Sequence, residues 1–407
     1  KSNLAAACHH HAAQLSANGA AGEALDLERR AFSMDAANPI ITAQLATYYN
    51  NCGRNAAQTG EVAHAMSLLS EAMKLQPRNR VFVTNMCVLL IRESRNLQKK
   101  GDAEKAAALL NEAAGMDPAS FHVQEALGEF HYSRNDFAAS VRHLEQALSI
   151  KPGATNVAAR LEQIRKEASI ETGFGKTDRS RFIIRYQDGV NEDLSWKVSA
   201  ILDDAYREIG QKVQCWPAAP ITAIVYSKEQ FKAVTSAPDW TIGRFDGKLR
   251  ICASDLTLGD EALKRVVRHE YTHALVYDLY GAGIPLWINE GLAQYAEQDR
   301  ELSELDKALI HHVGMDKLVP PWQLNADFNS KKGEEVALAY LESRHFMKYM
   351  FDRYGNHVTR QFIRENSTKN ADLAEITRRM FNMDPEQLYA DWLVGFKKQC
   401  TPAPKPD

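Results

Sequence analysis

The sequence predicts a multidomain protein, in which an all-α array of helical repeats precedes an α+β domain that ends in a helical subdomain. Three observations indicate this order. The segment 1–170 is rich in Ala, Leu and Glu and contains no convincing strand pattern; short β-rich runs begin only after residue 180; and the pattern is mainly helical again from residue 301. With 407 residues and 45% hydrophobic content, the chain is long enough for two or three domains.

Prolines that follow apolar helical segments recur at regular intervals in the segment 1–170. Apolar helical segments run to Pro39, Pro77, Pro118 and Pro152, at spacings that stay near the repeat length of helix-pair solenoids. A period near ~34 residues with Ala- and Leu-rich helix pairs closed by proline is the tetratricopeptide signature, so residues 1–170 are predicted to form a tetratricopeptide solenoid. Such a stack presents a concave groove, which either binds a peptide or partner protein or serves only as a brace.

Residues 171–180, with Gly173 and Gly175, are predicted to be a linker. Residues 181–300 are predicted to be an α+β catalytic subdomain, and residues 301–398 a C-terminal helical subdomain with a polar tail over 399–407. The elements expected before residue 260 are strands over Arg181 to Tyr186 and Ile221 to Tyr226, an amphipathic helix over Leu194 to Val213, and a hairpin over Gly243 to Ala253 around Asp246-Gly247.

The motif His-Glu-Tyr-Thr-His at residues 269–273 lies in a stretch without Gly or Pro that has helical periodicity. Two histidines four residues apart lie one turn from each other on a helix, so His269 and His273 can reach one ion. Glu270 then points beside the metal, as suits a general base acting on a zinc-bound water. Glu290, in an apolar helix seventeen residues later, can supply the third ligand. We therefore predict one Zn²⁺ per chain, held by His269, His273 and Glu290.

Two other interpretations stay open for this motif. The histidines can be polar residues of an amphipathic helix, with Glu290 favoured by the helix dipole. The domain can also be a metal-free relic of a former enzyme.

On these residues the chain resembles the gluzincin metallopeptidases, which include thermolysin and the zinc aminopeptidases. It is similar in particular to bacterial peptidase MA-like domains, over roughly residues 180 to 398. The matching segments are Arg268 to His273, Pro285 to Ala293 and Phe245 to Gly247. The resemblance implies a thermolysin-like α+β catalytic domain with His269, His273 and Glu290 as ligands and Glu270 as the base. It also implies that an extended substrate pairs with an edge strand, for which Leu249 to Ala253 is the candidate.

Hydrolysis of a peptide bond also needs a donor for the oxyanion. Tyr340, fifty residues after Glu290, resembles the catalytic tyrosine of zinc aminopeptidases in its placement, although the local sequence departs from their Tyr-Glu-Lys-Gly pattern; a core tyrosine is the alternative. His345, His311 and His312 are competing donors. For the carboxylate behind a metal-bound histidine, Glu297 is a candidate, or else exposed to solvent, with Asp255, Asp260 and Asp278 as further options.

The predicted function is a zinc-dependent metallopeptidase, whose repeat domain binds the protein substrate or a partner protein. The chain lacks a counterpart of the aminopeptidase Gly-x-Met-Glu-Asn segment before His269, which favours an endopeptidase over an aminopeptidase. The alternative is a tetratricopeptide binding scaffold with an inactive gluzincin-like domain.

Composition narrows the remaining possibilities. A net charge of −3 without a long basic run argues against nucleic acid as a partner. No apolar stretch approaches the ~20 residues of a transmembrane helix. Six scattered cysteines without a CxxC pair indicate neither a zinc knuckle nor a disulfide framework. The first residue is Lys, so we expect a removed leader or a trimmed start, and the resemblance favours an exported bacterial protein, either periplasmic, envelope-associated or secreted.

Overall fold

The structure is a computed structural model, which describes residues 2–178, 181–187, 192–236, 243–252, 260–297, 306–307, 310–311, 318–325 and 334–400. The chain divides into two compact units, Lys1–Ser169 and Ile170–Asp407. The boundary falls two residues before the end of helix α9, so Ile170 and Glu171 belong to the second unit. Within the described ranges, no helix combines the length and apolar character needed to cross a bilayer.

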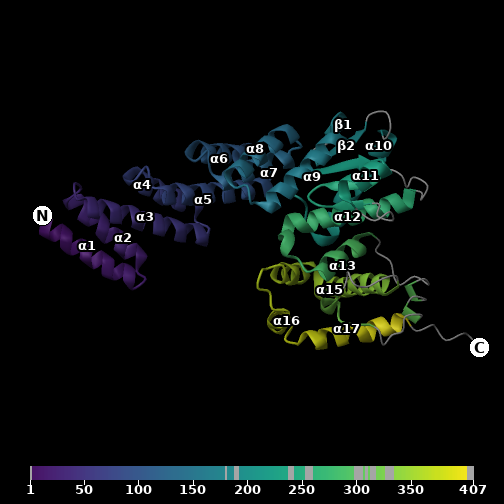
Figure 1. Cartoon of the computed structure of the whole chain (residues 1–407). Helices are drawn as coiled ribbons and strands as arrows, with labels where there is room; N and C mark the ends of the chain where they lie inside the picture. Colours follow the sequence, from purple (N-terminus) through teal and green to yellow (C-terminus); the bar gives the residue numbers. More distant parts are fainter. Residues whose placement is uncertain are drawn as a thin grey trace, which may run out of the picture. The chain divides into compact units, whose positions relative to one another are not determined.

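The described part of the first unit consists of helices that pack in consecutive pairs: α1 with α2, α3 with α4, α5 with α6 and α7 with α8, followed by α9 (Figure 1). Their bounds are α1 (Ser2–Ala17), α2 (Ala21–Met34), α3 (Pro39–Thr59), α4 (Val62–Leu75), α5 (Arg80–Lys99), α6 (Ala103–Met116), α7 (Phe121–Ser133), α8 (Phe137–Ile150) and α9 (Thr155–Glu171). The side chain of Asn38 caps the start of α3, and Gly60, with a φ of 86°, ends it in the left-handed conformation.

Equivalent contacts recur between these pairs. Hydrogen bonds join residues 35 apart: Asn85 Nδ2 on α5 donates to Asn50 Oδ1 on α3 at 2.7 Å, and Arg92 Nη2 on α5 to the Ala57 carbonyl of α3 at 2.6 Å. In the same way, Tyr132 Oη on α7 donates to Glu167 Oε2 on α9 at 2.8 Å. Within two of the pairs, a Cβ on the first helix would collide with a leucine sixteen residues later, at Gly53 against Leu69 and at Gly128 against Leu144. These regularities support a helical repeat. Its assignment as a tetratricopeptide stays a prediction.

In the described part of the second unit, five strands form one sheet in the order β1-β2-β3-β5-β4. The strands are β1 (Phe174–Asp178), β2 (Phe182–Gln187), β3 (Ile221–Tyr226), β4 (Gly243–Phe245) and β5 (Leu249–Cys252). Strands β2, β3 and β5 run parallel, whereas β1 and β4 pair antiparallel to their neighbours. Because side chains alternate across a sheet, Val225, Leu249 and Ile251 face helices α10 (Glu192–Val213) and α12 (Asp260–Tyr280). Tyr226 and Cys252 face α11 (Lys228–Thr235) on the other side.

Two expectations about this sheet are corrected by the structure. Residues 171–180 are not a simple linker, because Glu171 ends α9 and Phe174–Asp178 form β1, whose backbone pairs with β2. The predicted hairpin around Asp246-Gly247 is confirmed, but Leu249 to Ala253 is not the edge strand. β5 is paired on both sides, by β3 and by β4, so β4 is the edge next to α12. Ala253 itself lies outside the described residues.

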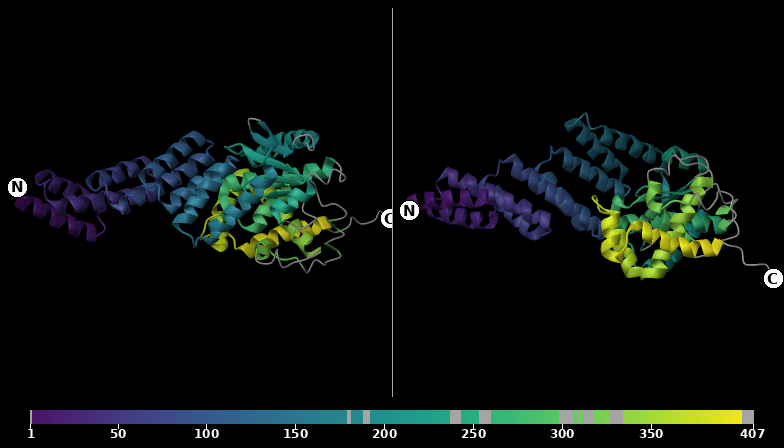
Figure 2. Two further views of the ribbon diagram at one scale, coloured as in Figure 1. Left: turned by 45° about the horizontal axis from the view of Figure 1, so that its top comes forward. Right: turned by 90° about the horizontal axis from the view of Figure 1, so that it is seen from below.

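The remaining described elements are helical. After α12 come η2 (Gly281–Gly283), α13 (Leu286–Glu297), η4 (Pro321–Asn325), α15 (Glu334–Asn366), α16 (Leu373–Phe381) and α17 (Pro385–Cys400). Figure 1 shows α12 and α13 between the sheet and the helices α15 to α17, and the views of Figure 2 show the same C-terminal helices grouped together. A Cβ at Gly291 would lie 2.6 Å from the Ser343 carbonyl oxygen, so glycine there permits the close approach of α13 and α15.

Candidate metal centre

The side chains of His269, His273 and Glu290 converge on one point. The two histidines lie one turn apart on α12, and Glu290 lies on α13, which packs against it. The Nε2 atoms of the histidines are 3.0 Å apart, and Glu290 Oε2 lies 3.5 Å from His269 Nε2 and 3.8 Å from His273 Nε2. Within the described residues, this is the group of His, Cys, Asp and Glu side chains whose ligand atoms come close enough to hold a metal ion.

These distances fit a zinc ion. Tetrahedral zinc with bonds of about 2.0–2.1 Å places neighbouring ligand atoms ~3.3 Å from each other. The three observed separations lie on both sides of that value. Two imidazoles and one carboxylate are also the donor set of catalytic zinc sites, which keep a further position for water or substrate.

Hydrogen bonds to the Nδ1 atoms orient the imidazole rings of His269 and His273. Glu297 Oε1 lies 2.5 Å from His269 Nδ1, and Asn289 Oδ1 lies 3.0 Å from His273 Nδ1. Carboxylate and amide oxygens are acceptors, so each Nδ1 carries the proton and each Nε2 is left to bind a metal. Arg268 strengthens this arrangement, because its guanidinium donates to the Ala296 carbonyl and ties the end of α13 to α12.

Glu297 therefore contacts His269 and is not simply exposed to solvent, as its candidate role behind a metal-bound histidine requires. Asn289 is a positioning residue that the sequence reasoning missed, although its place directly before Glu290 was a usable signal. Asp260 instead pairs with Lys197 at 2.8 Å, and Asp278 accepts from the Ala218 amide. Asp255 and His312 lie outside the described residues.

Negative charge is concentrated around the two imidazoles. Burial by itself lowers the pKa of His269, but hydrogen bonds with Glu290 and Glu297 outweigh burial and raise this pKa to about 10. Burial favours the neutral form of Glu290, yet its contacts with both histidines lower its pKa overall. For His273, burial lowers the pKa. The carboxylates thus stabilise a positive charge at the point where the ligand atoms meet, as a cation site requires.

Glu270 lies beside the metal-ligand atoms, between α12 and β4. Its side chain is buried, and burial raises its pKa to about 7 against the opposing charge of His269. The backbone amide of Phe245 on β4 donates a hydrogen bond to its carboxylate. A Cβ at Gly243 would lie 2.7 Å from Glu270 Cγ and 2.7 Å from Val266 Cγ1. The edge strand thus both holds Glu270 and needs glycine at residue 243 to do so.

We expect Gly243→Ala to displace Glu270 and to cost about 1–3 kcal/mol of stability, as overpacking of a dense site does. The three atoms nearest to the new methyl group all belong to Glu270 and Val266 of α12, so the helix and β4 must separate. Thermal unfolding of the variant measures the loss, and Gly22→Ala is the matched control, because a Cβ at Gly22 meets nothing within 4 Å. Equal unfolding temperatures for the two variants would contradict the tight contact.

A cleft of about 520 Å³ opens onto these residues. It is lined by Gly243, Arg244, Phe245, Asp246, Gly247, His269, Glu270, His273, Tyr277, Gly281, Ile284, Leu286, Asn289, Glu290 and Tyr340. Burial, and then the charges of Glu290 and Glu270, raise the pKa of Tyr340 to about 12, so its hydroxyl keeps a proton to donate at neutral pH. His345 and His311 do not line this cleft. The structure therefore brings Tyr340, rather than either histidine, to the candidate site.

Comparison with known proteins agrees with this geometry. Residues 204–396 match the model of the Peptidase MA superfamily, a range that begins within α10 and ends within α17. A search of curated proteins finds no match to the chain. The matched range contains β3, the β4–β5 hairpin and both helices of the candidate metal centre, and residues 204–396 are thus similar to domains of the Peptidase MA superfamily.

Proposed function

We propose that this protein is a zinc-dependent metallopeptidase in which His269, His273 and Glu290 hold the ion and Glu270 is the general base. The observation that carries the proposal is the convergence of three ligand atoms beside a buried carboxylate in one cleft. The superfamily match supports a peptidase, and the separations of the ligand atoms support zinc.

The residues of the cleft divide the work of hydrolysis. Zinc, when bound, lowers the pKa of its water and polarises the substrate carbonyl. Glu270, with a pKa near neutrality, can take a proton from the attacking water and pass it to the leaving amine. The Phe245 amide keeps the Glu270 carboxylate in place during this exchange. Tyr340 can donate its hydroxyl proton as a hydrogen bond to the developing oxyanion.

The edge strand suggests how a substrate binds. Among the described strands, none pairs with β4 on the side away from β5, and β4 lines the cleft, so an extended peptide can add to it by backbone hydrogen bonds. This binding mode suits an endopeptidase. The helical repeats of the first unit would then recruit the protein substrate or a partner protein through their concave face. An exported bacterial location is part of the same proposal.

Metal analysis and cleavage profiling test the proposal together. We expect one tightly bound zinc per chain and cleavage of a proteome-derived peptide library that a chelator abolishes. A protein that stays metal-free under zinc-replete conditions would refute the proposal. If the library stays intact while a partner still binds the His269→Ala variant, the inactive-scaffold alternative is correct.

For Tyr340→Phe, we expect kcat to fall about 10²-fold or more with little change in substrate affinity, because the hydroxyl acts on the oxyanion and not on the bound peptide. Steady-state kinetics on a cleaved library peptide measure kcat and KM separately. The ring stays in place in this variant, so folding and zinc content are expected to match the wild type. An unaltered kcat would remove Tyr340 from the mechanism.

Zinc affinity should rise with pH by about tenfold per unit between about pH 7 and pH 9. Glu290 and Glu297 keep His269 protonated up to a pKa of about 10, and zinc must displace that proton, whereas His273, with its lowered pKa, is already neutral. Competition with a chromogenic chelator at several pH values gives the slope. Calorimetry in two buffers gives the number of protons released, expected to be close to one. An affinity independent of pH would contradict this assignment of the proton.

A further inference from the structure

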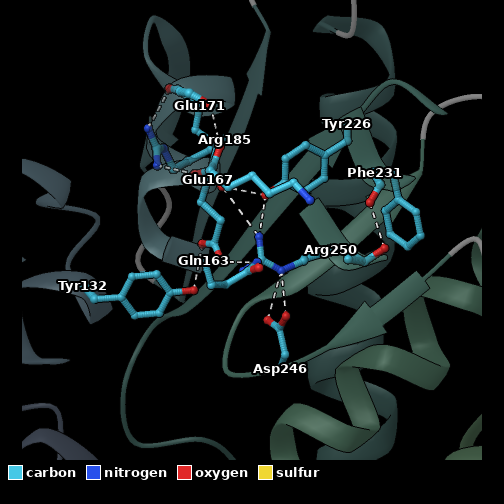
Figure 3. A network of polar contacts seen from close by, with 12 residues as sticks. Tyr132, Gln163, Glu167, Glu171, Arg185, Tyr226, Phe231, Asp246 and Arg250 are labelled. Atoms are coloured by element: carbon cyan, nitrogen blue, oxygen red, sulfur yellow. Dashed lines mark hydrogen bonds and ion pairs between the residues drawn. The ribbon is translucent and has the colours of Figure 1, made fainter. Parts of the chain in front are cut away.

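A buried network of charges lies on the face of the sheet opposite the metal helix (Figure 3). We call Glu171, Arg185, Tyr226, Arg250 and Asp246 the Arg250 network. Glu171 ends α9, Arg185 lies on β2, Tyr226 on β3 and Arg250 on β5. Glu171, Tyr226 and Arg250 are fully buried, with 0% of each exposed to solvent.

The contacts of the Arg250 network form a directed chain. Arg250 Nη1 donates to Tyr226 Oη at 2.5 Å, and that hydroxyl donates to Glu171 Oε1 at 2.6 Å. Arg185 Nη1 donates to the other oxygen, Glu171 Oε2, at 2.7 Å. Arg250 Nη1 also lies 3.6 Å from Glu171 Oε1. The guanidinium of Arg250 is therefore anchored on one side by a carboxylate that is itself held by two strands.

The other side of the Arg250 guanidinium contacts Asp246. Its Nε lies 3.0 Å from each carboxylate oxygen of Asp246. Asp246 belongs to the three-residue turn between β4 and β5, and Asp246 and Gly247 both line the cleft. Within the turn, the Asp246 amide donates to the Lys248 carbonyl at 3.3 Å, and Gly247 has a φ of 100°. A turn of this kind is stiffened when one of its side chains is held from outside.

Burial of charge in this network is costly. A fully buried ion pair often contributes no more stability than apolar residues of the same size would. Its distinctive property is geometric, because a guanidinium between two carboxylates is held by hydrogen bonds in one orientation. The residue next to Asp246 is Phe245, whose amide holds Glu270. The position of this turn therefore affects the position of β4, the proposed substrate-binding strand. Through Phe245, it also affects the position of Glu270, the proposed base.

We propose that Arg250 is a positioning residue for substrate binding, which clamps Asp246 from behind the sheet and thereby sets the β4–β5 turn at the rim of the cleft. The proposal rests on the proposed peptidase function. Arg250 does not reach the cleft itself, since the cleft is lined by Asp246 and not by Arg250. The anchor of the clamp is Glu171, so the rim of the cleft is tied to the last residue of α9.

Asp246→Asn is the main test variant, because the Asp246 side chain is 29% exposed and the change is isosteric. We expect kcat/KM on a cleaved library peptide to fall about tenfold, mainly through KM, because substrate-positioning groups act in this way. Arg250→Lys should also lower kcat/KM mainly through KM, since lysine keeps the positive charge but lacks the planar guanidinium that donates several hydrogen bonds in fixed directions. Arg378→Lys is the matched control: Arg378 likewise donates through Nε to an aspartate, Asp384, but it lies outside both the Arg250 network and the cleft, so the KM of this variant should equal that of the wild type.

Zinc content and amide hydrogen exchange separate this role from a merely structural one. All three variants should retain one zinc per chain, and exchange over residues 243–252 should be faster in Asp246→Asn and Arg250→Lys but not in Arg378→Lys. Unchanged KM and exchange in folded Asp246→Asn would overturn the proposal. A raised KM with unchanged exchange would also overturn it, since Asp246 would then contact the substrate directly. If the wild-type protein cleaves nothing, the peptidase function fails, and the exchange data alone decide whether Arg250 holds the turn.

Discussion

Glu270→Gln is expected to lower kcat by about 10²–10⁴-fold, the usual contribution of a general base, while zinc stays bound. The amide has the shape of the carboxylate but cannot accept a proton. Because burial already raises the pKa of Glu270 to about 7, the folded protein favours the neutral side chain, and removal of the charge should not destabilise it. Single-turnover cleavage of a library peptide measures the chemical step.

Two measurements on the same variant make this result interpretable. Metal analysis should give one zinc per chain for both Glu270→Gln and the wild type, and the thermal unfolding temperature of the variant should equal or exceed that of the wild type. A variant that keeps wild-type kcat would show that another group takes the proton. Loss of zinc from Glu270→Gln would instead place Glu270 among the ligands.

Removal of a predicted ligand should abolish tight zinc binding. We expect His273→Ala and Glu290→Gln to purify without zinc, because each leaves two donors for an ion that needs three from the protein. In the wild type, zinc at about a thousand times its Kd should stabilise the fold by about 4 kcal/mol. That stabilisation, measured as a rise of the unfolding temperature on addition of zinc, should vanish in both variants.

The loss of zinc affinity should be larger for a variant of a ligand than for a variant of a residue that only contacts a ligand. Glu297→Gln keeps all three ligands and alters only the partner of His269, so zinc affinity should fall about 10–100-fold and not disappear. His357→Ala, an exposed histidine of α15, is the control and should bind zinc as the wild type does. Zinc retained at full affinity by Glu290→Gln would contradict the three-ligand centre.

Local sequence accounts for much of helix α12 and of the helical repeats. The spacing of His269 and His273 requires only the geometry of one helix, which a stretch free of Gly and Pro predicts. The proline-closed helix pairs of the first unit likewise depend on contacts within and between neighbouring pairs. The predicted bounds of β3 match the observed ones, because a run of β-branched and apolar residues between turn signals specifies a buried strand.

The sheet is less predictable, because the order of strands depends on pairing between distant segments. The glycines of residues 171–180 indicate a linker, yet Phe174–Asp178 gain a full set of backbone partners from β2. The sequence predicts the hairpin around Asp246-Gly247, but its pairing does not reveal which of its strands meets β3. The edge next to the candidate site is therefore β4, and only the assembled sheet shows this.

The sequence by itself determined the helix that carries His269, Glu270 and His273, and with it the candidate ligands and the candidate base, because helical periodicity is a local property. Tertiary structure decided the rest: that Glu290 on α13 meets the two histidines, that Asn289 and Glu297 orient their rings, and that Tyr340 shares the cleft. It also joined Glu171 to Asp246 through Arg250. These contacts link residues that no sequence period relates, and packing between elements alone brings them within hydrogen-bonding distance.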